Sequence, residues 1–199
     1  MKNIQPAILI FCFMQLAIFC MCKNDTEKKA DNPSAPTVVN TNTSMQNSSL
    51  NKEFFMNAIG NLKSGEVLDS VTLKNILAQK IVDLTRTSLL SKKSEQGGAM
   101  VGTSEATYKG ENKTLYIKII DAGGNAGYIR SQAPWSGMQF QNTRDDGYEK
   151  SIVVDGNKIK EAFNSGTKQA NLTVIYNDRI LVNLFGPNVT MEELYMAIK

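Results

Sequence analysis

The sequence predicts an α+β fold for residues 51–199, with helices set apart from an antiparallel sheet. Apolar residues recur at helical spacing at both ends of this region. Between the ends, apolar and polar residues alternate as in strands, and pairs of turn-forming residues separate the alternating segments. We expect one domain, in which two N-terminal helices and one C-terminal helix pack on an antiparallel sheet of about six strands. The strands are expected to form a meander of hairpins, and the second sheet face to be partly in contact with water.

Two helices are predicted at the start of the domain. Residues 52–62 place apolar side chains at helical spacing, and Ser70 is a residue type that caps helices. Residues 85–92 fit a strand or a loop. The glycine-containing segment 94–102 is expected to form a turn.

The predicted sheet is formed by segments that alternate between apolar and polar residues. These segments are residues 104–109, 114–121, 148–154, 158–163, 170–176 and 179–185. The pairs Asp155-Gly156 and Asn177-Asp178 separate neighbouring segments and are typical of two-residue hairpin turns. These turns predict that the later strands follow one another as antiparallel neighbours.

The end of the chain predicts a short helix. Gly186 and Pro187 are expected to end the sheet, because proline cannot donate a backbone hydrogen bond. Thr190 follows, with Glu193 three residues later, which is the spacing of a capping box. We therefore expect a helix that begins at Thr190 and docks its apolar side chains on the sheet.

The N-terminus has the organisation of a secretory signal. Lys2 and the amino terminus are positive, and residues 7–21 carry no charge. This apolar segment is shorter than the roughly 20 residues that a membrane-spanning helix needs. We expect residues 1–22 to be a signal peptide, with an uncleaved membrane anchor as the alternative.

Two of the three cysteines, Cys20 and Cys22, lie where this apolar segment ends. A leucine, Leu16, precedes Cys20 by four residues, and the chain becomes fully polar directly after Cys22. This arrangement resembles bacterial lipoprotein signals, in which a cysteine receives a diacylglycerol and becomes the new N-terminus. The resemblance implies acylation, with chains such as palmitate, at Cys22 or alternatively at Cys20. The other interpretation is that both cysteines are ordinary apolar members of the signal.

Residues 23–50 are expected to be a disordered tether. Asn, Ser, Thr and Pro dominate this segment, and its few apolar residues cannot offset the entropy of ordering it. A flexible chain of this length spans roughly 30 Å on average. Such a tether would hold the domain at 51–199 away from a membrane to which the cysteine is fixed.

Composition excludes several kinds of chemistry. The 199-residue chain contains no histidine, which excludes a Ser-His-Asp triad and a His-ligated metal. No cysteine follows Cys22, so the domain has neither a disulfide framework nor a thiol catalyst. The net charge of +3 is too small, and the basic residues too scattered, for a nucleic-acid-binding protein. We expect no cofactor and no metal.

The candidate binding loop is residues 128–147, the longest segment without clear periodicity. It contains Tyr128, Arg130, Trp135 and Phe140, and aromatic and arginine side chains often dominate binding energy at protein interfaces. The alternative is that Trp135 and Phe140 fold back onto the core. If the domain has a recognition loop, these four residues are its predicted contacts.

Two other segments suggest chemistry only weakly. The glycine-rich residues 121–127 match neither nucleotide-binding glycine motif, and we expect them to form a flexible connection. Asp145, Asp146 and Glu149 cluster in sequence but lack the spacing of a calcium-binding loop. We expect these carboxylates to lie on a solvated turn.

Four short stretches in the second half of the chain carry a resemblance. They are SEATYKG at 104–110, Asp-Ala-Gly-Gly at 121–124, DGYEK at 146–150 and RILVNLFG at 179–186. Together they resemble a group of uncharacterised bacterial cell-envelope lipoproteins. The resemblance implies a location and a fold type, and it brings no catalytic residues.

The sequence therefore predicts a lipid-anchored cell-envelope lipoprotein, on the outer membrane or the periplasmic face. Its domain is expected to be a non-catalytic binding domain, with a protein or glycan partner and with the membrane as a partner through the lipid. One alternative is an exported hydrolase that uses carboxylates, so the question of enzymatic activity stays open. Another is a structural envelope component. If the anchor prediction is wrong, a secreted protein is expected.

Overall fold

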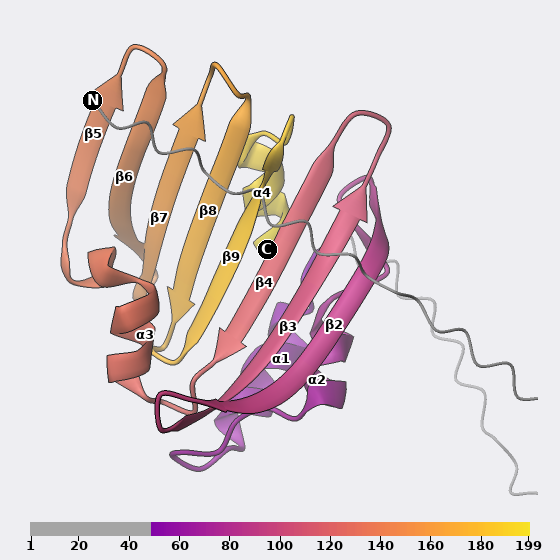
Figure 1. Ribbon diagram of the computed structural model, residues 1–199, viewed down its shortest axis with the longest axis vertical. Coiled ribbons are helices and arrows are strands. Elements are labelled where there is room, and N and C mark those ends of the chain that lie inside the picture. The colour runs from indigo at the N-terminus through magenta and orange to yellow at the C-terminus, as the bar shows by residue number, and fades with distance from the viewer. Residues whose placement is uncertain (1–48) are drawn as a thin grey trace, which may run out of the picture. The chain divides into compact units, whose positions relative to one another are not determined.

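The computed structural model describes residues 49–199, which form an α+β domain with one open antiparallel sheet (Figure 1). This confirms the predicted fold class. Two details are corrected, because the described residues contain nine strands and four α-helices where about six strands and three helices were expected. All six predicted strands are present, and the additional elements lie in segments with weak apolar periodicity.

The helices come from three parts of the chain. They are α1 (Lys52–Gly60), α2 (Ser70–Ile76), α3 (Ala126–Gln132) and α4 (Met191–Ile198), with a short 3₁₀ helix at Pro134–Gly137. The N-cap of α2 is Asp69, one residue before the predicted Ser70. The backbone N–H of Thr72, helped by its hydroxyl, holds the pKa of Asp69 below its usual value. The predicted capping box at Thr190 and Glu193 is confirmed.

The strands join into a single sheet in which every neighbouring pair is antiparallel. They are β1 (Lys80–Ile81), β2 (Leu84–Gln96), β3 (Ala99–Lys109), β4 (Thr114–Asp121), β5 (Phe140–Arg144), β6 (Gly147–Val154), β7 (Asn157–Asn164), β8 (Gln169–Tyr176) and β9 (Ile180–Pro187). Their order is β1-β2-β3-β4-β9-β8-β7-β6-β5. The predicted single meander is therefore corrected, because β4 pairs with β9 and not with the next strand in sequence. This central contact joins two hairpin groups that are distant in sequence.

The predicted turn at 94–102 is wrong. β2 and β3 run through most of it, and only Gly97 and Gly98 turn the chain, both with positive φ (58° and 75°). Glycine has no Cβ that opposes this conformation. The alternation of apolar and polar residues in β2 is weak because this strand lies near the edge of the sheet. Most of its residues are at least partly exposed there.

The predicted loop at 128–147 is also corrected, because it holds most of α3, the 3₁₀ helix and β5. β5 forms the sheet edge, and its residues from Gln141 to Arg144 are exposed on both sides, so no alternation marks it. The predicted break at Gly186 and Pro187 is displaced, since β9 continues to Pro187. Proline is tolerated there because it is the last residue of its strand.

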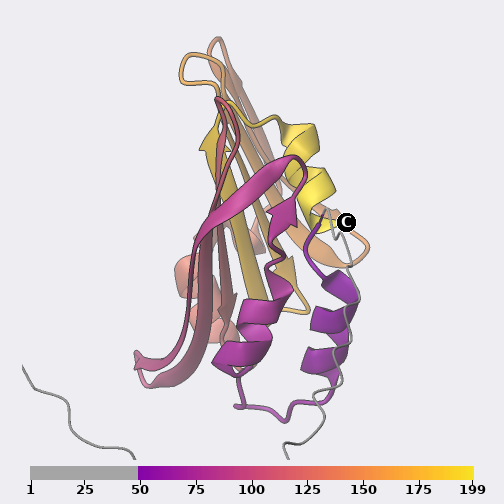
Figure 2. The same ribbon diagram turned by 90° about the vertical axis from the view of Figure 1, so that its right-hand side faces the viewer.

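The main core lies between one face of the sheet and α1, α2 and α4 (Figure 2). The alternate residues Leu115, Ile117 and Ile119 of β4 enter this core, as do Leu172 and Val174 of β8. The domain includes residue 50, because Leu50 is buried in this core and its backbone N–H donates to Ala197 O at 2.7 Å. Three helices thus cover this face, as the sequence predicts for the helices at either end of the domain.

A second, smaller core lies on the opposite face, at one end of the sheet. There α3 and the 3₁₀ helix cover Ile120, Ile175 and Leu181, and α3 is seen in front of the sheet in Figure 1. No helix of residues 49–199 covers the rest of this face. We call the uncovered part the open face.

Candidate functional site

The predicted binding-loop residues lie mostly in the second core. Trp135 is buried, and Tyr128 and Phe140 pack against the same cluster. The hydroxyl of Tyr128 donates to Gln96 Oε1 at 2.7 Å. Arg130 is exposed and lines a small hollow of about 180 Å³. The structure thus brings the three aromatic side chains together as packing residues and leaves the arginine at the surface.

The predicted acylation sites, Cys20 and Cys22, lie outside the described residues. So does all of the predicted tether at 23–50 except its last two residues. Within residues 49–199, no helix is both long enough and apolar enough to cross a membrane.

The glycine-rich segment after β4 has a structural role. Asn125 caps α3 by accepting from the backbone N–H of Tyr128 at 2.9 Å. Gly123 (φ +62°) packs so closely on the backbone that an added Cβ would lie 3.0 Å from Gly65 O. Asp121 is fully buried and accepts from Leu68 N at 2.7 Å. This segment therefore fastens the connection between α1 and α2 to the sheet.

The open face is organised in rows that cross the strands. Because strands pair in register, side chains at matched positions form a line across the sheet. The first row contains Thr107, Tyr116, Phe185, Asn171, Ala162 and Glu149. The second row contains Glu105, Lys118, Asn183, Thr173, Lys160 and Ser151. Aromatic, amide and charged side chains thus share one surface, although β4 and β8 are far apart in sequence.

An aromatic pair stands in the first row. The rings of Tyr116 and Phe185 are stacked, with centroids 5.0 Å apart and an interplanar angle of 22°. Tyr116 is 39% exposed, although it lies on a central strand. Large aromatic side chains left at the surface are a feature of binding sites, because they supply contact area at little entropic cost.

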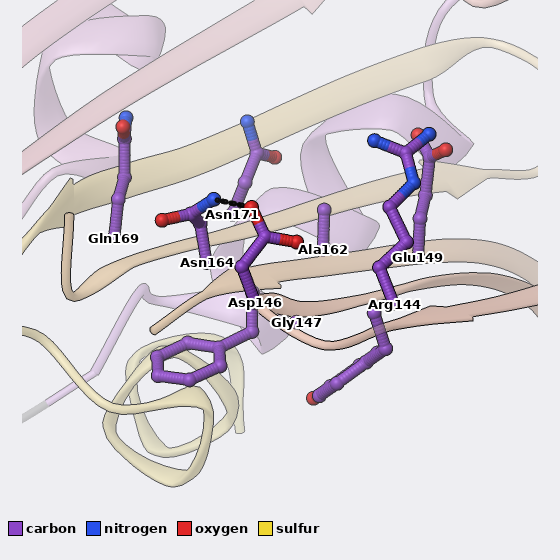
Figure 3. Close-up of a pocket in the computed structure, with 10 residues that line it drawn as sticks. Arg144, Asp146, Gly147, Glu149, Ala162, Asn164, Gln169 and Asn171 are labelled. Atoms are coloured by element: carbon purple, nitrogen blue, oxygen red, sulfur yellow. Dashed lines mark hydrogen bonds between the residues drawn. The ribbon is translucent and has the colours of Figure 1, made fainter. Parts of the chain in front are cut away.

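Two hollows flank this pair. One, of about 430 Å³, lies over β3, and Leu90 of β2 and Tyr116 of β4 are among the residues that line it. The other, of about 360 Å³, lies over β7 at the small side chain of Ala162. Figure 3 shows this second hollow, with Arg144 and Asn171 among the side chains around it. The predicted acidic turn borders it, and there Asp146 accepts from Asn164 Nδ2 at 3.1 Å.

Amide groups lie between the aromatic pair and the second hollow. The hydroxyl of Thr173 lies 3.3 Å from Oδ1 of Asn171 and 3.3 Å from Oδ1 of Asn183. The hydroxyl has one proton, so it donates to one of these two amide oxygens at a time. The two amide nitrogens make no hydrogen bond to any other part of the chain that the structure describes. These N–H groups are available to a ligand.

The charges of the two rows are paired within the sheet. Lys118 Nζ lies 2.8 Å from Glu105 Oε1, and Lys160 Nζ lies 2.5 Å from Glu149 Oε1. Partly exposed pairs of this kind stabilise a fold by no more than about 1 kcal/mol. Their main consequence is that the two rows present polar groups without a net charge.

A buried carboxylate lies on the opposite, helix-covered face. Glu161 is 4% exposed and accepts from Tyr195 Oη at 2.6 Å and Tyr148 Oη at 3.3 Å, while Lys150 Nζ lies 3.1 Å away. Burial, followed by the neighbouring carboxylate, raises the pKa of both tyrosines. The cluster is satisfied internally and links β6 and β7 to α4. The described residues contain no group of three acidic, cysteine or histidine side chains that could hold a metal ion.

Sequence reasoning missed the open face as a site. The strand segments that carry Tyr116, Asn171 and Phe185 were predicted, and these residues stand at the positions that alternate with the core. The signal was therefore present within each strand. The turn at Asn177-Asp178 correctly predicted that β8 and β9 are neighbours. What could not be read was that β4 pairs with β9.

Comparisons with models of protein families, with curated proteins and with solved structures gave no match to this chain. The resemblance to cell-envelope lipoproteins therefore stays a prediction, and the open face is the candidate functional site that the geometry offers.

Proposed function

We propose that the protein is a lipid-anchored cell-envelope lipoprotein whose folded domain is a non-catalytic binding domain, and that the open face is its binding surface. The N-terminal pattern supports the location, because an apolar segment that ends at Cys20 and Cys22 is followed at once by polar residues. A single cysteine that bears several acyl chains holds a protein on a membrane far more firmly than one chain does.

One observation carries the binding proposal. The stacked pair of Tyr116 and Phe185 stands between two hollows, on a sheet face over which no helix of the described residues lies. Binding sites combine concave surface and aromatic contact area with a few well-placed polar groups. The open face provides all three within two rows of side chains.

The pairing of the acidic residues supports binding in preference to hydrolysis. A carboxylate-dependent hydrolase needs two facing carboxyl groups whose environments separate their pKa values. On the open face, Glu105 and Glu149 each pair with a lysine. Asp146, at the second hollow, accepts from Asn164 Nδ2. Such pairing suits a surface that is organised before its ligand arrives.

Amine labelling of the protein in native envelopes tests the proposal. Lys118 lies on the open face, and Lys74 lies on α2, on the other side of the sheet. We expect labelling of Lys118, divided by labelling of Lys74, to fall several-fold in native envelopes relative to the full-length mature protein in detergent. The fall is expected because a bound ligand covers the open face. Peptide mass spectrometry measures both sites in one sample.

The ratio of Lys118 labelling to Lys74 labelling contains an internal control, because both sites are measured in the same sample. The ion pair of Lys118 with Glu105 is present in both samples, so it does not change the comparison. An equal ratio in envelopes and in detergent would show that the open face is not occupied in the cell, and it would contradict the proposal.

A further inference from the structure

We infer that the ligand of the open face is an uncharged, extended oligosaccharide that lies across the strands, along the first row. This inference rests on the proposed function and names the ligand class of that same surface. Four properties of the open face lead to it: its aromatic pair, its amide groups, its charge balance and its dimensions.

The aromatic pair provides a surface for sugar rings. An aromatic face is electron-rich, so it attracts the weakly positive C–H groups on the flat side of a pyranose ring. Tyr116 and Phe185 use one face each to stack on one another. Tyr116 borders the hollow over β3, and a sugar ring seated there contacts its ring and the hydroxyl of Thr107.

The amide groups match the hydroxyl and acetamido groups of sugars. Sugar hydroxyls both donate and accept hydrogen bonds, and an acetamido carbonyl accepts. The oxygens of Asn171 and Asn183 lie within reach of the Thr173 hydroxyl, and the N–H donors of both amides have no partner among the described residues. Because strand pairing places both amides in neighbouring rows, a ligand that accepts from them requires little rearrangement of the protein.

The charge balance disfavours other ligands. A polyanion needs unpaired cations, but Lys118 and Lys160 are each paired with a glutamate in the two rows. Arg144 lines the second hollow together with two carboxylates, those of Asp146 and Glu149, which oppose an anion there. An acyl chain would cover these polar groups without hydrogen-bonding them, which carries a desolvation cost. A neutral ligand with many hydroxyl groups replaces the displaced water and leaves the ion pairs intact.

The dimensions suit a chain of several sugars. The first row from Thr107 to Glu149 crosses from β3 to β6, passing over β4, β9, β8 and β7. Neighbouring strands are about 4.8 Å apart, so five spacings amount to roughly 24 Å, and each spacing is close to the length of one pyranose unit. A flat, extended chain can therefore place successive rings over successive strands.

The test is calorimetric titration of the full-length mature protein in detergent with a neutral hexasaccharide of β-1,4-linked N-acetylglucosamine. We expect saturable binding, with an affinity at least tenfold higher than that for the monosaccharide, because the longer chain reaches both hollows. A sulfated hexasaccharide is expected to bind more weakly than the neutral one.

Matched variants locate the site. Tyr116→Ala is expected to weaken hexasaccharide binding about tenfold, whereas Phe54→Ala on α1, a residue with the same 39% exposure, leaves it unchanged. Asn171→Asp keeps the shape but removes the donor, and is expected to weaken binding about fivefold. Asn57→Asp, at an exposed position of α1, is its control.

Several outcomes would overturn the inference. They are absence of saturable binding, equal affinity for the monosaccharide and the hexasaccharide, tighter binding of the sulfated probe, or unchanged binding by both Tyr116→Ala and Asn171→Asp. The labelling experiment distinguishes failure of this inference from failure of the proposed function. If the hexasaccharide does not bind while Lys118 is still protected in native envelopes, the ligand class is wrong and the binding surface stands.

Discussion

At the scale of single residues, the domain depends on one buried ion pair. Asp121 is fully buried and lies 3.0 Å from Arg179 Nε, and Arg179 also donates to Glu66 O at 2.6 Å. Asp121 further accepts from the backbone N–H groups of Leu68 and Gly123. The pair therefore joins the end of β4, the start of β9 and the connection between α1 and α2.

We predict that Arg179→Met lowers the free energy of unfolding by about 3 to 5 kcal/mol, because it leaves the Asp121 carboxylate buried without its cation. Urea denaturation measures the change. Lys158→Met is the control, since its partner Asp178 is 66% exposed and the loss there is expected to be below about 1 kcal/mol. Similar losses for the two variants would show that Arg179 does not have this role.

Residue-level features were predictable where they depend on neighbours in sequence. The capping box of Thr190 and Glu193 is local, and it was predicted correctly. Trp135 is different, because an aromatic residue between α3 and β5 suits a binding loop as well as a core. The structure shows that Trp135 packs in the second core, where Ile129 and Leu181 are also buried. The sequence alone does not bring these three residues together.

At the scale of elements, the contact between β4 and β9 depends on a glycine. An added Cβ at Gly186 would lie 1.9 Å from Thr114 O, so the two strands meet there without room for a side chain. This close approach explains why Gly186 lies inside β9, where the sequence suggested that the sheet ends.

We predict that Gly186→Ala destabilises the domain by about 2 kcal/mol or more, because backbone must move to make room for the methyl group. Gly60→Ala, at the end of α1, is the matched control, since nothing lies within 4 Å of its added Cβ. There alanine is expected to stabilise by up to about 1 kcal/mol. Thermal unfolding compares the two, and tolerance of Gly186→Ala would show that the strands separate easily.

Strands were predictable in proportion to their burial on one face. β4 alternates between buried and more exposed residues over Leu115 to Ile119, and its boundaries were predicted correctly. β1, β2 and β5 lie at or near the sheet edges, so fewer of their side chains are buried. Hydrophobic alternation reports burial, and it therefore weakens at an edge.

At the scale of the whole molecule, the open face follows from strand order. Tyr116 and Phe185 are 69 residues apart in sequence, and they stack because β4 and β9 are neighbours. A single sequence assigns strands but does not pair distant ones. The fold class could thus be predicted, while the surface that the strands build together could not.

We propose that an acylated cysteine joins this surface to a membrane. The intact mass of the protein purified from its native membrane fraction, with and without an inhibitor of the lipoprotein signal peptidase, shows whether the cysteine is acylated. We predict a mature chain that begins at Cys22 or Cys20 and is heavier by a diacylglycerol, with a longer precursor when the inhibitor is present. A chain that keeps both cysteines unmodified, or that begins at another residue, would show that the protein is not anchored by a lipid on either cysteine.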